Sequence, residues 1–98
     1  LIGVASVFKV ENENFDKKNQ FQLRGMAVLS EYQGSGFGNV LLDEICNFVK
    51  VKNGEILWFN ARENAVKFYQ NYGFSVLGDS FEIPEIGTHF VMFKRFVV

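Results

Sequence analysis

A glycine-rich hexapeptide joins a predicted strand to a predicted helix, and its residue types suit the binding of an anion. It spans Gln33 to Gly38 and reads QGSGFG, with three glycines in five positions. Glycine permits a backbone φ above 0° and the close approach of a ligand. The first amides of the following helix have no internal partner, and the helix dipole adds to their attraction for negative charge. The segment therefore predicts a site for a phosphate or a pyrophosphate.

The known glycine patterns narrow the kind of phosphate ligand. A P-loop requires a Lys after its last glycine, and no Lys follows this segment. A dinucleotide fingerprint requires a third glycine, which would fall on Asn39 or on Leu41. The pattern that remains is [Q/R]-x-x-G-x-[G/A], met by Gln33, Gly36 and Gly38. A pattern of six residues can recur by chance, so an ordinary glycine-rich turn is the alternative interpretation.

The elements around this loop predict an α/β fold with a mixed sheet, an α+β arrangement. Strands are expected at 1–10, 21–29, 55–61, 74–77 and 88–97, with a polar turn at 11–19 and another turn around 78–80. Apolar residues recur at helical spacing over 37–52 and again from Ala65 to Tyr72, where Gly73 closes the helix. The order is ββαβαββ. Strands 21–29 and 55–61, joined by a helix, suggest a central parallel pair between antiparallel hairpins.

Two flanking segments make the resemblance to a family specific. The loop pattern is similar to that of the GNAT (GCN5-related N-acetyltransferase) superfamily. Residues 25–28 (GMAV) with 31–33 (EYQ) resemble its central strand and loop entry, and 64–74 (NAVKFYQNYGF) resemble its helix with A-x-x-[FL]-Y-x-x-x-G-F. Residues 81–92 resemble, less closely, the final hairpin of a bacterial branch with a G-x-H element. The resemblance implies the GNAT-like acyl-CoA N-acyltransferase fold, with its central parallel strands splayed apart.

The resemblance also implies a ligand, acetyl-CoA as co-substrate, and a set of contacts to it. Backbone groups of Met26, Ala27 and Val28 would bond the pantetheine arm, and one amide there would polarise the thioester carbonyl. The pyrophosphate would lie on the loop amides of Gly34, Ser35, Gly36, Phe37, Gly38 and Asn39, preceded by Gln33. Asn64 and Phe68 are further candidates for cofactor contact. Arg62 stands where many members carry a cofactor-binding Asn, and it is a candidate for the same role because it could reach a phosphate or a carbonyl of the cofactor.

The implied reaction is transfer of the acetyl group to a primary amine by direct attack in a ternary complex. Tyr69 stands where the family places its general acid, although a core aromatic on an amphipathic helix is the alternative. His89, the single histidine, is a weaker catalytic candidate, with a structural or surface role as its alternative. Cys46, Trp58 and Phe59 are expected to be core residues. The general base and the acceptor, a small molecule or a peptide, are left open.

Composition and charge argue against several other classes of protein. The 98 residues suffice for one small domain, predicted to span 1–98, and the net charge of -1 gives no sign of nucleic-acid or membrane binding. One Cys and one His provide no metal-ligand spacing, and the single Cys fits a reducing compartment, so a cytoplasmic location is expected.

Family members carry a further strand and two helices before the segment that 1–10 resembles. We therefore expect a shortened chain, a natural minimal version, or a partner chain that replaces those elements.

Two other functions compete with an enzyme at this stage. One is a module that binds CoA without turnover, motivated by Arg62 and by the expected missing N-terminal part. The other is an interaction protein that forms a homodimer, because the chain begins within a predicted strand and an open sheet edge invites pairing.

Overall fold

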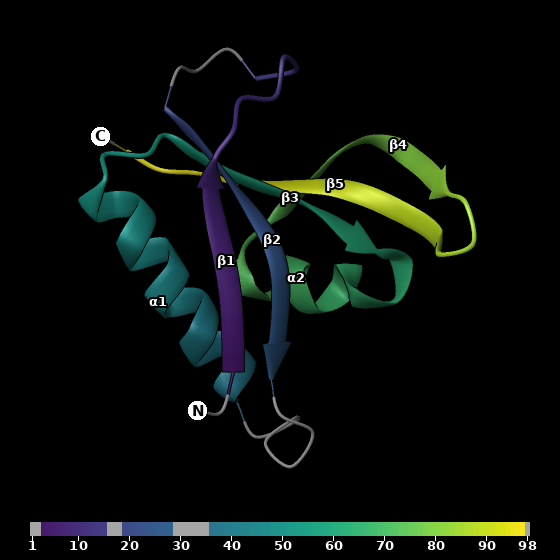
Figure 1. Cartoon of the computed structure of the whole chain (residues 1–98), viewed down its shortest axis with the longest axis horizontal. Coiled ribbons are helices and arrows are strands. Elements are labelled where there is room, and N and C mark those ends of the chain that lie inside the picture. Colours follow the sequence, from purple (N-terminus) through teal and green to yellow (C-terminus); the bar gives the residue numbers. More distant parts are fainter. Residues whose placement is uncertain (1–2, 16–18, 29–35, 98) are drawn as a thin grey trace.

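The computed structural model describes residues 3–15, 19–28 and 36–97, which build one mixed sheet with helices packed against it (Figure 1). The strand order across the sheet is β1-β2-β3-β5-β4. Along the chain the elements are β1 (Gly3–Lys9), β2 (Gln20–Val28), α1 (Phe37–Val51), β3 (Ile56–Arg62), the 3-10 turn η2 (Glu63–Ala65), α2 (Val66–Tyr72), β4 (Ser75–Ile83) and β5 (Gly87–Arg95). The predicted ββαβαββ order is confirmed, with the 3-10 turn added before the second helix.

The pairing of the strands also follows the prediction. β1 and β2 form an antiparallel hairpin, and β4 and β5 form a second one. β2 pairs in parallel with β3, and α1 connects the two strands. β5 lies between β3 and β4 and is antiparallel to both. A central parallel pair between antiparallel hairpins is therefore confirmed.

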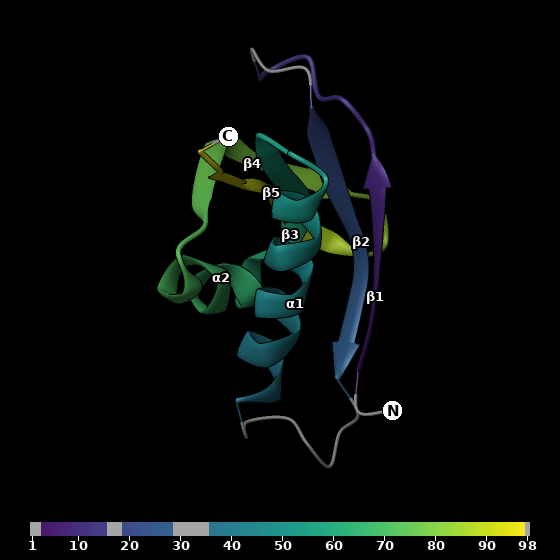
Figure 2. The same cartoon turned by 90° about the vertical axis from the view of Figure 1, so that its left-hand side faces the viewer.

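Both helices pack on the same face of the sheet (Figure 2). The α1 residues Leu42, Ile45, Cys46 and Val49 are buried there, at the three- and four-residue spacing of one helix face. They belong to one cluster with alternate residues of the central strands, namely Phe21, Leu23, Leu57, Phe59 and Ala61. The predicted core position of Cys46 is confirmed. Among the described residues, no helix combines the length and the apolar character that crossing a membrane requires.

The opposite face of the sheet has its own smaller apolar cluster. Ile56 and Trp58 alternate along β3 with the residues of the helix side and are buried. The indole Nε1 of Trp58 donates a hydrogen bond to the carbonyl oxygen of Val10 at 2.9 Å. Trp58 and Phe59 are therefore both core residues, as predicted, on opposite faces of one strand.

The polar segment predicted at 11–19 lies between β1 and β2, and it contains one buried aromatic residue, Phe15. This ring is only 6% exposed and lies 5.2 Å, centroid to centroid, from the ring of Phe93. The buried side chain of Gln20 holds the segment in place, since it accepts a hydrogen bond from the Asn12 amide at 2.6 Å and donates one to the Phe15 carbonyl at 3.3 Å. Phe15 stands among polar residues, and its partner Phe93 lies some eighty residues away in the chain, so no local pattern indicates that Phe15 is buried.

The predicted short strand at 74–77 and the turn around 78–80 are corrected to one longer strand. β4 runs from Ser75 to Ile83, and its pairing with β5 shifts register between Leu77 and Phe81. Gly78 lies in this irregular stretch with a φ of 69°. A bulge absorbs turn-forming residues without ending the strand, and sequence signals do not separate a bulge from a turn. The true hairpin turn follows Ile83, and β5 ends at Arg95 instead of residue 97.

The junction between α1 and β3 is closed by a tightly packed glycine. The Gly54 amide donates to the Val49 carbonyl at 2.8 Å, which completes the end of the helix. A Cβ atom on residue 54 would lie 2.4 Å from Val49 Cγ1 and 2.9 Å from Phe21 Cδ2. The close approach therefore requires glycine, and it sets where β3 begins beside β2.

We expect Gly54→Ala to lower the free energy of unfolding by about 1–3 kcal/mol, because its methyl group overpacks the buried contact with Val49. Urea denaturation monitored by circular dichroism measures the loss. The exposed α1 substitution Glu44→Ala is the control and should stay within about 0.5 kcal/mol of the parent. Equal midpoints for Gly54→Ala and the parent would contradict the packing described here.

Candidate active site

The two central strands separate part-way along their length. Within the described residues, their parallel pairing runs from Gln20↔Ile56 to Gln22↔Trp58 and stops. β2 nevertheless continues to Val28 and β3 to Arg62, and Figure 1 shows the two strands diverging. The splayed pair that the resemblance implied is present.

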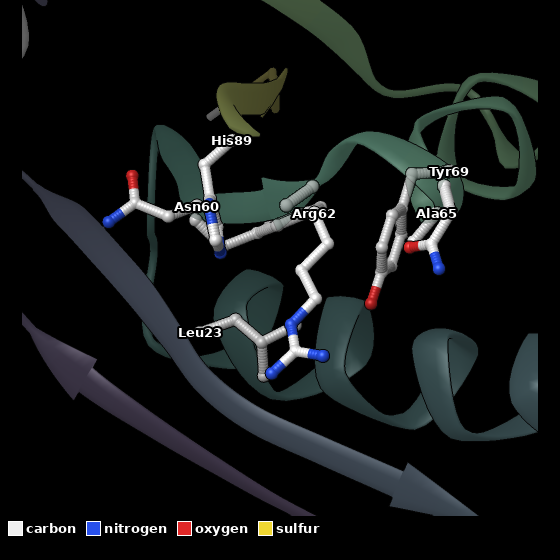
Figure 3. A pocket seen from close by; sticks show the side chains of 9 residues that line it. Leu23, Asn60, Arg62, Ala65, Tyr69 and His89 are labelled. Atoms are coloured by element: carbon white, nitrogen blue, oxygen red, sulfur yellow. The ribbon is translucent and has the colours of Figure 1, made fainter. Parts of the chain in front are cut away.

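A pocket of about 400 Å³ lies at this divergence (Figure 3). Residues of β2, β3, η2, α2 and β5 all contribute to its wall. They are Leu23, Phe59, Asn60, Ala61, Arg62, Asn64, Ala65, Tyr69 and His89. Segments far apart in the sequence thus meet at the point where the sheet opens.

Beyond Gln22, the edge of β2 that faces β3 has no strand partner among the described residues. Its other edge pairs with β1, where Ala5 lies opposite Met26 and Ser6 opposite Arg24, so Gly25 bulges out of the ladder. Unpaired strand amides and carbonyls can bond an extended ligand as an added strand. The backbone of 26–28, predicted to bond the pantetheine arm, lies in this segment of β2.

The N-terminus of α1 supplies free amides. Gly36 precedes the helix with a φ of 85°, in the left-handed region that glycine tolerates, and a Cβ there would meet nothing within 4 Å. The first helical hydrogen bond runs from the Val40 amide to the Gly36 carbonyl at 3.2 Å. The amides of residues 36–39, which include those of Phe37, Gly38 and Asn39, therefore precede the helical ladder. Gln33, Gly34 and Ser35 lie outside the described residues.

A second glycine brings α2 against the start of α1. A Cβ on residue 38 would lie 3.0 Å from Cζ of Phe68, so Gly38 leaves just enough room for that ring. Phe68 is 39% exposed and its ring lies 5.1 Å from that of Tyr69. This contact connects the predicted anion site to the pocket through two adjacent aromatic side chains.

Tyr69 enters the pocket from α2, with its hydroxyl directed into the space (Figure 3). Its ring packs against Phe59 at 4.5 Å and Phe74 at 6.1 Å. Burial raises the pKa of the Tyr69 phenol above its usual value of 10. The group therefore stays protonated at neutral pH, which is the state that a proton donor requires.

His89 is buried, at 5% exposed, and lines the same pocket from β5. Its Nδ1 lies 2.9 Å from the carbonyl oxygen of Gly87. A carbonyl only accepts, so this contact assigns the hydrogen to Nδ1 and leaves Nε2 as the acceptor of the neutral ring. The ring of Phe81 packs 5.9 Å away. A surface position, the sequence alternative for His89, is thereby ruled out.

Arg62 ends β3, directly opposite His89 in the strand pairing. Figure 3 shows its guanidinium reaching across the gap toward Leu23. Asn64, in the 3-10 turn, also lines the pocket. An adjoining hollow of about 250 Å³ shares Arg62 and Asn64 and adds Glu63, Ile86 and Thr88.

The structure adds lining residues that sequence reasoning did not select, chiefly Asn60 and Leu23. Asn60 interrupts the apolar run of β3 and is exposed there, a signal that was available in the sequence. Leu23 resembles any other core residue of a strand, and only the separation of β2 from β3 exposes it to the pocket. Nothing in its sequence position could have indicated this.

A polar cluster lies on the helix side, away from the residues that line the pocket. The Tyr72 hydroxyl hydrogen-bonds to Asp43 and lies 3.9 Å from the Cys46 sulfur. Burial raises the pKa values of the Cys46 thiol and of the Tyr72 phenol, the latter also through its bond to Asp43. A thiol held protonated is a poor nucleophile, consistent with the core role predicted for Cys46.

Comparison with known proteins identifies the family. Residues 1–76 match the family model described as acetyltransferase (GNAT) domain. The chain belongs to the GNAT acetyltransferase family. The resemblance predicted from the glycine loop and the Ala65–Phe74 segment is confirmed.

Two curated relatives, both named N-acetyltransferases, match by sequence. The uncharacterized N-acetyltransferase YitI of Bacillus subtilis is 32% identical over 94 residues, 96% of this chain and 63% of that protein. The [ribosomal protein bS18]-alanine N-acetyltransferase of Haemophilus influenzae is 40% identical over 55 residues, 54% of this chain and 38% of that protein. The chain thus spans less than two thirds of either relative's length.

Solved structures show the same GNAT fold. An aminoglycoside 6'-N-acetyltransferase complexed with coenzyme A has a TM-score of 0.80 at 12% identity, over 99% of this chain and 67% of that one. A GNAT family acetyltransferase from Elizabethkingia anophelis with acetyl-CoA bound has a TM-score of 0.76 at 16% identity, over 98% and 69%. At these identities the likeness shows the fold alone.

The part of the GNAT chain that the structure describes holds no cluster of three His, Cys, Asp or Glu residues suited to a metal ion. The groups that it does bring together are backbone amides, an unpaired strand edge, a phenol, an imidazole and a guanidinium.

The Gly38–Phe68 contact is testable by a double-mutant cycle on unfolding free energy. Gly38→Ala gains helix propensity but pushes against the Phe68 ring, so the substitution should be less favourable in the parent than in a Phe68→Ala background. We expect a coupling of about 0.5–1 kcal/mol, measured by urea denaturation of the four variants. A coupling of zero would show that the ring does not rest on residue 38.

Proposed function

We propose that this chain transfers an acetyl group from acetyl-CoA to a primary amine, by direct attack of the amine on the thioester. The observation that carries the proposal is the pocket at the strand divergence, which joins the Tyr69 phenol to the unpaired edge of β2. Family membership supports the reaction class, and the GNAT neighbours with CoA or acetyl-CoA bound support the co-substrate.

Acetyl-CoA is proposed to bind through its pyrophosphate and its pantetheine arm, both held by backbone groups of this chain. The amides at 36–39, with those of Gly34 and Ser35 before them, would hold the pyrophosphate. The pantetheine arm would bond the free edge of β2 at Met26–Val28, as an added strand does. An amide of that segment would then point at the thioester oxygen and stabilise the negative charge that develops on it.

The proposed step breaks one bond and forms another. The neutral amine attacks the carbonyl carbon, a C–N bond forms, and the C–S bond breaks with its electron pair on sulfur. The Tyr69 phenol gives its proton to the leaving thiolate, and the nitrogen loses a proton to the resulting phenolate through solvent. Products are the acetamide and free CoA, with Tyr69 restored.

Calorimetric titration with acetyl-CoA tests the binding half of the proposal. Gly36→Glu places a negative side chain at the proposed pyrophosphate site and should abolish binding that the parent shows. Gly78→Glu is a matched control, because Gly78 also has a positive φ, is exposed and has nothing within 4 Å of its Cβ position, but lies on β4. Equal weakening by both variants, or no binding by the parent, would contradict the proposal.

Tyr69→Phe tests the chemical half. The variant keeps the ring packing against Phe59 and Phe74 but removes the dissociable proton. We expect kcat to fall by about 10²- to 10⁴-fold, while the Kd for acetyl-CoA changes less than twofold. Chromatographic measurement of free CoA formed with a panel of amines follows the rate. An unchanged kcat would remove Tyr69 from the mechanism.

A further inference from the structure

We infer that the pocket takes an amine that carries a carboxylate beside it, with Arg62 pairing the carboxylate and His89 taking the proton of the ammonium group. The inference rests on the proposed acetyl transfer and deepens it, since it names the chemical class of the acceptor. It is carried by the positions of Arg62 and His89 on neighbouring strands, by the charges around the pocket, and by the hydrogen bond that orients His89.

The strand pairing separates the two sides of the pocket. Side chains on a strand alternate between faces, so Phe59 and Ala61 lie on the helix side, as does Tyr69 of α2. Arg62 and Asn60 share the other face of β3. His89 lies directly opposite Arg62 in the ladder and therefore shares its face. Tyr69 thus enters the gap from the helix side and His89 from the other face, while the guanidinium of Arg62 reaches across the gap toward Leu23 (Figure 3).

The charge of the lining favours an anionic group on the acceptor. Arg62 is the one charged residue among those that line this pocket in the described chain, and the lining includes no Asp or Glu. No ion pair to Arg62 is seen among the described residues, and its neighbour Glu63 lines the adjoining hollow instead. A polyamine would bring further positive charge toward a guanidinium. A carboxylate would accept the paired hydrogen bonds for which the guanidinium is shaped.

The spacing of the two side chains fits an α-amino acid or a closely similar molecule. Residues directly opposite in an antiparallel pair have Cβ atoms about 5 Å apart, so their side chains can engage adjacent groups of one small ligand. The adjoining hollow of about 250 Å³, lined partly by Ile86 and Thr88, offers room for the rest of the acceptor.

The orientation of His89 suits removal of a proton from the ammonium group. Its Nδ1–H is held by the Gly87 carbonyl, and the Phe81 ring packs beside it, so Nε2 is the remaining acceptor. The other titratable groups at this place are Arg62 from β3 and Tyr69 from α2; Glu82 of β4 accepts a bond from the Thr88 hydroxyl. Among the described residues, no carboxylate lines the pocket, and the imidazole of His89 is the group there that can act as a base.

The proton balance closes with these groups. The ammonium group gives one proton to Nε2 of His89 and becomes the amine that attacks the thioester. Tyr69 protonates the thiolate and regains a proton from the new amide nitrogen. The imidazolium then releases its proton to solvent, which matches the single proton that the overall reaction liberates.

The test compares amino acids with their own carboxamides, which differ only in the charged group. With the parent chain we expect kcat/KM for the acid to exceed that for the amide by about 10- to 100-fold. Arg62→Gln should raise KM for the acid and bring the ratio near one, with the acetyl-CoA Kd within twofold. Arg62→Lys should restore only part of the preference. Lys67→Gln, an exposed cation of α2 that does not line the pocket, is the control and should keep the full preference.

His89→Gln provides the second readout. We expect a lower kcat for acid and amide alike, and loss of the low-pH limb over which the parent rate rises as its base loses a proton. A merely structural role would lower stability, measured by urea denaturation, and leave the shape of the pH profile unchanged.

The outcomes separate this inference from the proposed function. Acetylation of amides or polyamines as efficiently as of amino acids would overturn the acceptor class, while acetyl transfer itself stood. Loss of acetyl-CoA binding in Arg62→Gln would overturn the assignment of Arg62 to the acceptor. Failure of the parent to acetylate any amine would instead overturn the proposed function, and the inference with it.

Discussion

The early end of the parallel pairing between β2 and β3 is the constraint on which the site depends. Beyond Gln22 and Trp58, β2 and β3 are no longer paired by backbone hydrogen bonds. Residues of α1 and α2 pack on one face of both strands in a single apolar cluster. Within the described residues, the divergence leaves one edge of β2 without a strand partner and opens the pocket, so one departure from regular pairing creates both features.

Aromatic packing sets the position of Tyr69 within that space. Its ring lies against Phe59 of the sheet and against Phe68 and Phe74, the residues that flank it on α2 and at its end. The same burial that orients the phenol raises its pKa and keeps its proton in place. The packing of the Tyr69 ring therefore also sets the protonation of its phenol. Gly38 contributes to this packing, because the absence of a side chain there leaves room for Phe68 against the start of α1.

Sequence reasoning succeeded where the signal was local. The glycine loop, the amphipathic helices and the Ala65–Phe74 pattern indicated the element order and the family, because each depends on residues within one or two turns of chain. It gave no sign that Phe15 is buried against Phe93 of the last strand, and it was wrong at β4, where a bulge replaces the expected turn. The first depends on a partner about eighty residues away, and the second on the register of pairing with the neighbouring strand β5, which turn-forming residues do not specify.

By itself the sequence determined the GNAT family and the order of the strands and helices. It also made residues 33–39 a candidate anion site, and Tyr69 and His89 candidates for proton transfer. Only the tertiary structure decided that His89 is buried, that it stands opposite Arg62, and that both reach the same pocket as Tyr69. The physical reason is that strand pairing and divergence arise between segments far apart in the chain, and no local pattern encodes where two strands part.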